Sequence, residues 1–140
     1  MRTETEAVES RRRGHVLIVD DDPDTQFIFL AALEYAGYRV RIEADGVGAL
    51  VAIRQEVPDI VILDLAMPLL SGLEVLAQLK ADPATRAIPV IACTATATLN
   101  DVPMLRDHGF AEVLLKPIDP TVMVTAVDRV RLSVLHEPLE

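Results

Sequence analysis

Three aspartates and a lysine in this sequence have the types and spacing that metal-assisted phosphoryl chemistry needs. Asp20, Asp21, Asp64 and Lys116 each follow an apolar, strand-like run. Carboxylates crowded into one cleft repel one another, and a hard divalent cation such as Mg²⁺ removes the cost of keeping them ionised. A lysine supplies a second positive charge, and a carboxylate left accessible can act as a nucleophile that forms an acyl phosphate. We therefore look for elements that bring these four side chains together.

Five short apolar runs rich in β-branched residues predict five strands. The first, third and fourth are almost continuously apolar, as expected of strands buried on both faces of a parallel sheet. The second alternates between apolar and charged residues, which predicts an edge strand. The five runs are His15–Asp20, Tyr38–Glu43, Asp59–Asp64, Ile88–Thr94 and Ala111–Lys116.

Helix signals fill every gap between these strands. Predicted N-caps at Asp22, Asp45, Ser71 and Asp119 open four helices, which run to about Gly37, to about Glu56, to about Asp82, and beyond Pro120. The remaining helix is expected to begin late, near Asn100, because Pro103 is tolerated only in a first turn. The first helix is apolar over a wide arc, which indicates either deep burial or a helix–helix contact with a partner.

Strands alternating with helices predict an α/β fold, a doubly wound (βα)5 domain with a parallel sheet in the order 2-1-3-4-5 between two helical layers. Open sheets of this kind carry their sites at the carboxyl ends of the strands. That edge would collect Asp20, Asp21, Asp64, Lys116 and also Thr94, whose hydroxyl can donate to a phosphoryl oxygen. We expect Asp64 to be the nucleophile because its strand is central.

Composition narrows the function classes. The chain has 140 residues, a formal charge of −9 and 51% hydrophobic residues, which predicts one folded domain and disfavours binding to nucleic acid or to an anionic membrane. The single cysteine, Cys93, excludes an internal disulfide and indicates a reducing compartment. No signal peptide and no apolar run of membrane-spanning length occur, so we expect a cytoplasmic protein. The scattered His15, His108 and His136 have no metal-ligand spacing.

Charge and motif positions also divide the chain. Residues 1–13 are polar, with four arginines against three glutamates, and we interpret them as a flexible extension. Residues 14–136 form the predicted domain, and residues 137–140 a short tail. No DNA-binding or catalytic segment follows the last predicted helix, so we expect either a stand-alone protein or a fragment of a longer one.

The motifs at the strand ends, taken in order, are similar to those of a known family. The sequence resembles the receiver domain of two-component response regulators over roughly residues 14–136. This resemblance rests on Asp20-Asp21, Asp64-Leu-Ala-Met-Pro68, Ser71-Gly72, Thr94-Ala95 and Lys116-Pro117.

The resemblance implies a phosphorelay function. Asp64 would accept a phosphoryl group from a sensor histidine kinase or a histidine phosphotransferase, and phosphorylation would change binding to a downstream protein. Mg²⁺ would be held by Asp21, Asp64 and the backbone carbonyl of Ala66, with Asp20 acting through water. Lys116 would contact the phosphoryl group, and its bond to Pro117 would be cis. Such a domain is not an enzyme with turnover; it can form a dimer.

One position departs from the family pattern. The residue three before Lys116 is usually Tyr or Phe, and here it is Val113. In the family, movement of the hydroxyl at the position of Thr94 is coupled to rotation of that ring, which valine cannot reproduce. We therefore expect the loop after the fourth strand to carry more of the response. Ala66 and Thr96, at positions that tune phosphate lifetime in similar proteins, offer no strong base, which favours a phosphate that is not short-lived.

Two other functions require motifs that this sequence does not match. A Mg²⁺-dependent aspartyl-phosphate phosphatase needs a D-x-D-x-[TV] motif on its first strand and a cap domain, and neither fits this chain. A flavodoxin-like cofactor binder needs a glycine- and hydroxyl-rich phosphate loop, whereas residues 20–25 read DDDPDT. Both patterns match less well than the receiver pattern.

Overall fold

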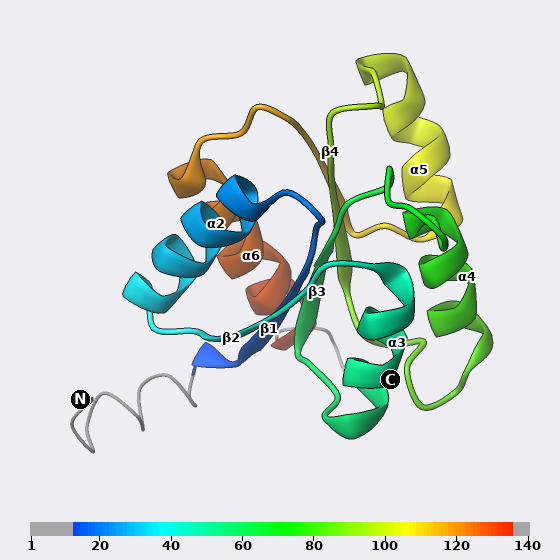
Figure 1. Cartoon of the computed structure of the whole chain (residues 1–140), viewed down its shortest axis with the longest axis horizontal. Helices are drawn as coiled ribbons and strands as arrows, with labels where there is room; N and C mark the ends of the chain where they lie inside the picture. The colour runs from blue at the N-terminus through cyan, green and yellow to red at the C-terminus, as the bar shows by residue number, and fades with distance from the viewer. Residues whose placement is uncertain (1–12, 136–140) are drawn as a thin grey trace.

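The computed structural model describes residues 13–135, and its centre is a five-stranded parallel sheet (Figure 1). The strand order is β2-β1-β3-β4-β5, which confirms the predicted order. The alternating strand lies at an edge, as predicted. The strands are β1 His15–Val19, β2 Arg39–Glu43, β3 Ile60–Leu63, β4 Val90–Thr94 and β5 Glu112–Leu115. β4 begins two residues later than predicted, directly after Pro89, which has no N–H to donate to the sheet.

The register brings the carboxyl ends of the central strands level with one another. Val19 of β1 pairs with Leu63 of β3, and the Asp64 N–H donates to the Val19 carbonyl at 2.9 Å. On the other side, Leu63 pairs with Ala92 of β4. The residues that follow β1 and β3 therefore emerge side by side at one edge of the sheet.

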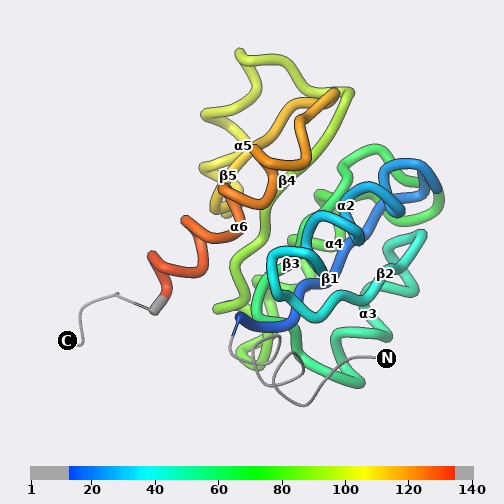
Figure 2. Tube along the Cα trace, turned by 90° about the vertical axis from the view of Figure 1, so that its left-hand side faces the viewer, coloured from blue at the N-terminus to red at the C-terminus, as the bar shows by residue number. Residues whose placement is uncertain are grey.

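Helices cover both faces of the sheet. α2 (Pro23–Tyr35) and α6 (Pro120–Leu135) lie on one face, and α3 (Gly46–Gln55), α4 (Gly72–Ala81) and α5 (Val102–His108) lie on the other (Figure 1). Figure 2, which views the molecule from the α2 and α6 side, has both helices in front of the strands. A 3-10 turn, η1 (Leu99–Asp101), precedes α5, so this helical segment begins close to the predicted Asn100.

Alternate residues of the buried strands supply two separate cores. On the α3–α5 side, Leu17, Val61 and Ala92 pack with residues such as Leu76 and Leu105. On the other side, the neighbouring strand residues Ile18, Ile62 and Cys93 pack with Phe29 of α2 and Val127 of α6. This is the three-layer arrangement that the continuous apolar strands predicted, since a strand buried on both faces needs a helical layer on each.

Side-chain caps begin three of the helices where the sequence predicts them. Asp22 accepts from the Thr25 N–H at 3.2 Å, Asp45 from the Gly48 N–H at 2.7 Å, and Ser71 from the Glu74 N–H at 3.3 Å. Each cap satisfies one of the free N–H groups of a first turn. These helices are therefore held at their N-termini by residues that lie close to the ends of the strands.

Deep burial of the first helix was the wrong interpretation of its apolar arc. Phe29 and Leu33 of α2 are buried, but Phe27 is 71% exposed and Ile28 is 46% exposed. A helix in an outer layer presents only one face to the sheet, and α2 has α6 beside it on that layer. A helix–helix contact with a partner, the other interpretation, stays a prediction for this exposed side.

The two predicted terminal segments fall mainly outside the described residues. The extension 1–13 is described only at Arg13, and the tail 137–140 is not described at all. Within residues 13–135, no helix has the length and apolar character needed to cross a membrane.

Candidate functional site

Four of the predicted site residues lie at the ends of four strands. Asp20 follows β1, Asp64 follows β3, Thr94 is the last residue of β4, and Lys116 follows β5. Parallel strands place these ends at one edge of the sheet, as expected. The structure thus assembles residues that are up to 96 positions apart in the sequence.

The three aspartates form one carboxylate cluster. One oxygen from each of Asp20, Asp21 and Asp64 lies within 4.8 Å of the other two. Their exposure differs, because Asp20 and Asp64 are 3% and 7% exposed whereas Asp21 is open to solvent. The cluster therefore has two buried carboxylates and one that is exposed to solvent.

Lys116 is the cation of this cluster. Its Nζ donates to Asp20 Oδ2 at 2.6 Å and lies 3.5 Å from Asp64 Oδ2. Burial acts to lower the pKa of Lys116, but the hydrogen bond and the charges of the two aspartates outweigh it, so the pKa is raised. The lysine is consequently held in its charged form at the centre of the site.

Asp20 is the most enclosed of the three aspartates. Burial raises the pKa of its carboxyl, although the hydrogen bonds from Lys116 and from the Asp22 N–H at 2.9 Å act in the opposite direction. Its carbonyl also accepts from the Gln26 side-chain amide at 2.5 Å, which ties α2 to the end of β1. Ionisation of buried Asp20 therefore costs the folded protein free energy.

This raised pKa predicts how stability depends on pH. The native state binds the Asp20 proton more tightly than the unfolded chain does. The stability that protonated Asp20 contributes is therefore fully present below pH 3.8, which is the ordinary aspartate pKa, and it is lost as the pH rises through the raised pKa. We expect Asp20→Asn to have a higher free energy of unfolding than the wild type at neutral pH without divalent metal, and we expect the difference to vanish in acid. Urea unfolding at a series of pH values measures it. A variant less stable at neutral pH would mean that the Lys116 hydrogen bond outweighs desolvation.

Asp64 is held by backbone on two sides. Its Oδ1 accepts from the Ala66 N–H at 3.1 Å. Behind it, α4 begins so close that a Cβ on Gly72 would lie 2.5 Å from the Asp64 carbonyl oxygen and 2.7 Å from Leu65 Cα. Only glycine permits this approach, so Gly72 helps to fix the loop that carries Asp64.

The donor set fits a hard divalent cation. Three carboxylates against one ammonium group leave two negative charges uncompensated within a few ångströms. Mg²⁺ prefers oxygen ligands of this kind and keeps several waters, which the solvent exposure of Asp21 permits. Direct binding of the ion by Asp21, Asp64 and the Ala66 carbonyl, and binding by Asp20 through water, stay predictions.

Three further features singled out in the sequence take no direct part in the carboxylate cluster. Cys93 is 1% exposed and burial raises the pKa of its thiol to about 12, so it is an inert core residue, as predicted. The Lys116–Pro117 bond is cis, as the resemblance implied. Val113 is half-buried and packs, like Ala97, against the core on the α3–α5 side.

The supporting contacts of three residues were not predicted. The contact of Gln26 arises only on folding, and no sequence signal indicates it. Gly72 belongs to the Ser71-Gly72 motif of the resemblance, but its close approach to the Asp64 backbone was not predicted. Thr96 was identified only at a position that tunes phosphate lifetime. In the structure its hydroxyl lies 2.9 Å from the hydroxyl of Thr94.

Comparison with known proteins gives one family. The model of the response regulator receiver domain matches residues 16–128. Protein PilH of Pseudomonas aeruginosa is 35% identical over 117 residues, which cover 84% of this chain and 97% of PilH.

Solved structures agree with this match. The signal receiver domain of a histidine kinase from Syntrophus aciditrophicus superimposes with a TM-score of 0.79 at 29% identity, over 91% of this chain and 96% of that one. The receiver domain of the sensor histidine kinase PA1611 from Pseudomonas aeruginosa, with a magnesium ion in its active site cleft, gives a TM-score of 0.77 at 29% identity, over 86% and 98% of the two chains. Because sequence and structure matches extend over the same sheet and the same acidic edge, this chain belongs to the response regulator receiver domain family of two-component signalling.

Proposed function

We propose that Asp64 accepts a phosphoryl group from the phosphohistidine of a sensor histidine kinase or a histidine phosphotransferase, with Mg²⁺ held beside it. The observation that carries this proposal is the convergence of two further carboxylates and the Lys116 ammonium group on Asp64, at the end of the central strand β3. The chain is then a phosphoacceptor that signals, and not an enzyme with external turnover. We place it in the cytoplasm, in line with its single, buried cysteine.

The phosphoryl transfer needs only Asp64 and the phosphohistidine of the donor as reacting groups. A carboxylate oxygen of Asp64 attacks phosphorus, the P–N bond to the donor imidazole breaks, and its electron pair returns to the imidazole nitrogen. The product is an acyl phosphate on Asp64. Lys116 Nζ, 3.5 Å from Asp64 Oδ2, is in position to contact a phosphoryl oxygen. Bound Mg²⁺ would supply positive charge against the carboxylates and the phosphoryl oxygens.

The wild-type protein provides the direct test. Incubated with acetyl phosphate and Mg²⁺, it should gain the mass of one phosphoryl group on the peptide that contains Asp64, and chelation of Mg²⁺ should abolish the gain. Labelling that does not depend on Mg²⁺, or none at all, would contradict the proposal.

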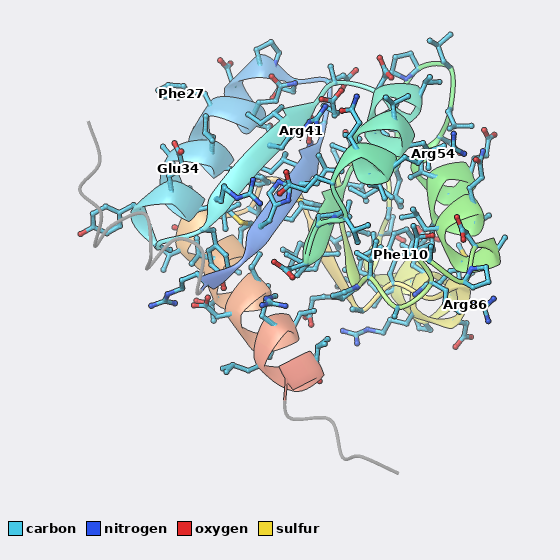
Figure 3. The ribbon with its side chains drawn as sticks, turned by 90° about the horizontal axis from the view of Figure 1, so that it is seen from below. Phe27, Glu34, Arg41, Arg54, Arg86 and Phe110 are labelled. Carbon is cyan, nitrogen blue, oxygen red and sulfur yellow. The ribbon has the colours of Figure 1, made fainter. Side chains whose placement is uncertain are left out.

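The donor would reach the site over the N-terminal half of α2. A cavity of about 380 Å³ lies there and is largely apolar. Its lining includes Lys116 of the site together with Ile28, Phe29, Pro117 and Ile118. Phe27, which Figure 3 shows on the outer side of α2, is also exposed but does not line this cavity. Because this apolar surface is continuous with the reactive edge, we propose that the donor's histidine-bearing segment docks on it.

A variant in this cavity separates docking from chemistry. We expect Ile28→Asp, at a 46% exposed position, to slow transfer from a phosphohistidine protein that labels the wild type by roughly tenfold or more, because a charge replaces an apolar contact. Labelling by acetyl phosphate should be unchanged, since that small donor needs no docking surface. Val51→Asp, on exposed α3, is the matched control and should behave as the wild type in both assays. If the Ile28 variant lost labelling equally with the phosphohistidine protein and with acetyl phosphate, the proposed docking on this cavity would be contradicted.

The response to phosphorylation is proposed to run through the loop after β4. With Val113 in place of an aromatic residue, there is no ring at this position of β5 to rotate, and Val113 packs against the core. The Thr94 hydroxyl is tied instead to Thr96 in that loop. The downstream partner would bind to this loop and to α5. A dimer could form through the same surface.

A further inference from the structure

Two threonine hydroxyl groups lie side by side at the end of β4. Thr94 is completely buried, at 0% exposure, whereas Thr96 is exposed. Their Oγ1 atoms are 2.9 Å apart, and the Thr96 N–H donates to Thr94 Oγ1 at 3.2 Å. Thr96 therefore touches the Thr94 hydroxyl with both its backbone and its side chain.

The hydrogen-bonding capacity of Thr94 indicates which of the two hydroxyl groups donates in the hydrogen bond between them. A hydroxyl has one proton to donate and two lone pairs to accept with, and the Thr96 N–H takes one lone pair. Within residues 13–134, the hydrogen bonds of the Thr94 hydroxyl go to Thr96, and none joins it to the Asp64 carboxylate. A buried donor without a partner is costly, so the Thr94 proton is satisfied by the Thr96 oxygen in this state.

We infer that Thr96 is a positioning residue that competes with the phosphoryl group for the Thr94 hydroxyl proton. This inference rests on the proposed function. A phosphoryl oxygen on Asp64 can gain the Thr94 proton only if the bond to Thr96 is given up. The charged oxygen wins because charge-assisted hydrogen bonds are stronger than bonds between neutral hydroxyls. Exposed Thr96 then bonds to water, and no buried polar group is left unpaired.

The same exchange connects the site to the loop that precedes α5. Thr96 lies between Thr94 and Thr98, and the Thr98 N–H donates to Asp101 at 2.7 Å to open η1. When Thr94 turns towards a phosphoryl group, the loop loses a hydrogen bond to the sheet. The Thr96 contact thus sets how strongly the unphosphorylated loop is held.

Removal of the Thr96 hydroxyl is the test. Thr96→Val keeps the shape and the N–H but removes the competitor, and we expect its affinity for beryllofluoride in the presence of Mg²⁺ to rise about three- to tenfold, the equivalent of one ordinary hydrogen bond. Thr96→Ser restores the hydroxyl and should match the wild type. Titration calorimetry suits the measurement, because the chain has no tryptophan. Thr125→Val, an exposed threonine on α6, is the matched control and should leave the affinity unchanged.

A double variant separates this role from a merely structural one. In a Thr94→Val background the gain from Thr96→Val should disappear, because the hydroxyl through which it acts is gone. An equal gain in both backgrounds, or unchanged or weaker binding by Thr96→Val, would overturn the inference while wild-type binding of beryllofluoride upholds the proposed function. A wild type that does not bind beryllofluoride would overturn the proposed function, and this inference with it.

Discussion

Asp64→Asn is expected to take up no phosphoryl group from acetyl phosphate, a fall of roughly 10³-fold or more, because an amide cannot form the acyl phosphate. The substitution hardly changes the shape of the side chain. Its oxygen can still accept from the Ala66 N–H, which is 3.1 Å from Oδ1 in the wild type, so the loop should keep its conformation. Mass spectrometry of the intact protein after incubation with Mg²⁺ measures the loss.

The control for this variant is the same chemical change at a distance. Asp107 is exposed on α5, and Asp107→Asn should be labelled as fully as the wild type. If Asp64→Asn were still labelled, peptide mapping would identify the true acceptor, and Asp20 or Asp21 would be the candidates to examine. Labelling of Asp20 or of Asp21 in this variant would show that Asp64 is not the phosphoryl acceptor.

Lys116→Met should affect both stability and phosphorylation. The lysine side chain is 17% exposed and its Nζ is 2.6 Å from Asp20 Oδ2, so its loss leaves crowded carboxylates without their cation. We expect the free energy of unfolding at neutral pH to fall by about 2 kcal/mol without metal, and Mg²⁺ to recover part of it by binding only the folded state. Phosphorylation should slow on the order of 10²-fold, since a donor to the phosphoryl oxygens is lost.

The chain offers a matched control in its other lysine. Lys80 lies on α4 and donates to the Arg86 carbonyl at 3.1 Å, outside the cluster. Lys80→Met should change neither the Mg²⁺ dependence of stability nor the rate of labelling by acetyl phosphate. Urea unfolding with and without Mg²⁺ compares the two variants. Identical behaviour of both would show that Lys116 does not act through the carboxylates.

The fold could be predicted because its local signals agree with one another. Continuous apolar strands, caps at Asp22, Asp45 and Ser71, and short connections all favour alternating strands and helices, and the structure has them. α2 was the exception. An apolar arc is a property of one helix, but whether a neighbour covers it depends on the packing of the layers, and Phe27 has no cover within the described part of the chain.

The site was predictable in its members but not in their environments. Asp20 and Asp21 are adjacent and chemically identical in the sequence, yet Asp20 is 3% exposed with a raised pKa and Asp21 is exposed to solvent. Burial depends on which side of a strand end faces the core, and on what closes over it. For Asp20 that is Lys116, which lies 96 positions away.

The sequence by itself determined that Asp20, Asp21, Asp64, Thr94 and Lys116 gather at one edge, because parallel strands turn a spacing along the chain into a shared place in space. Only the tertiary structure decided how their charges and protons are arranged. It buries Asp20 against Lys116, pairs the Thr94 hydroxyl with Thr96, and brings Gly72 under the loop of Asp64. Contacts of 2.5–3.5 Å depend on side-chain orientation and close packing, and residue types and spacing along a chain do not encode these directly.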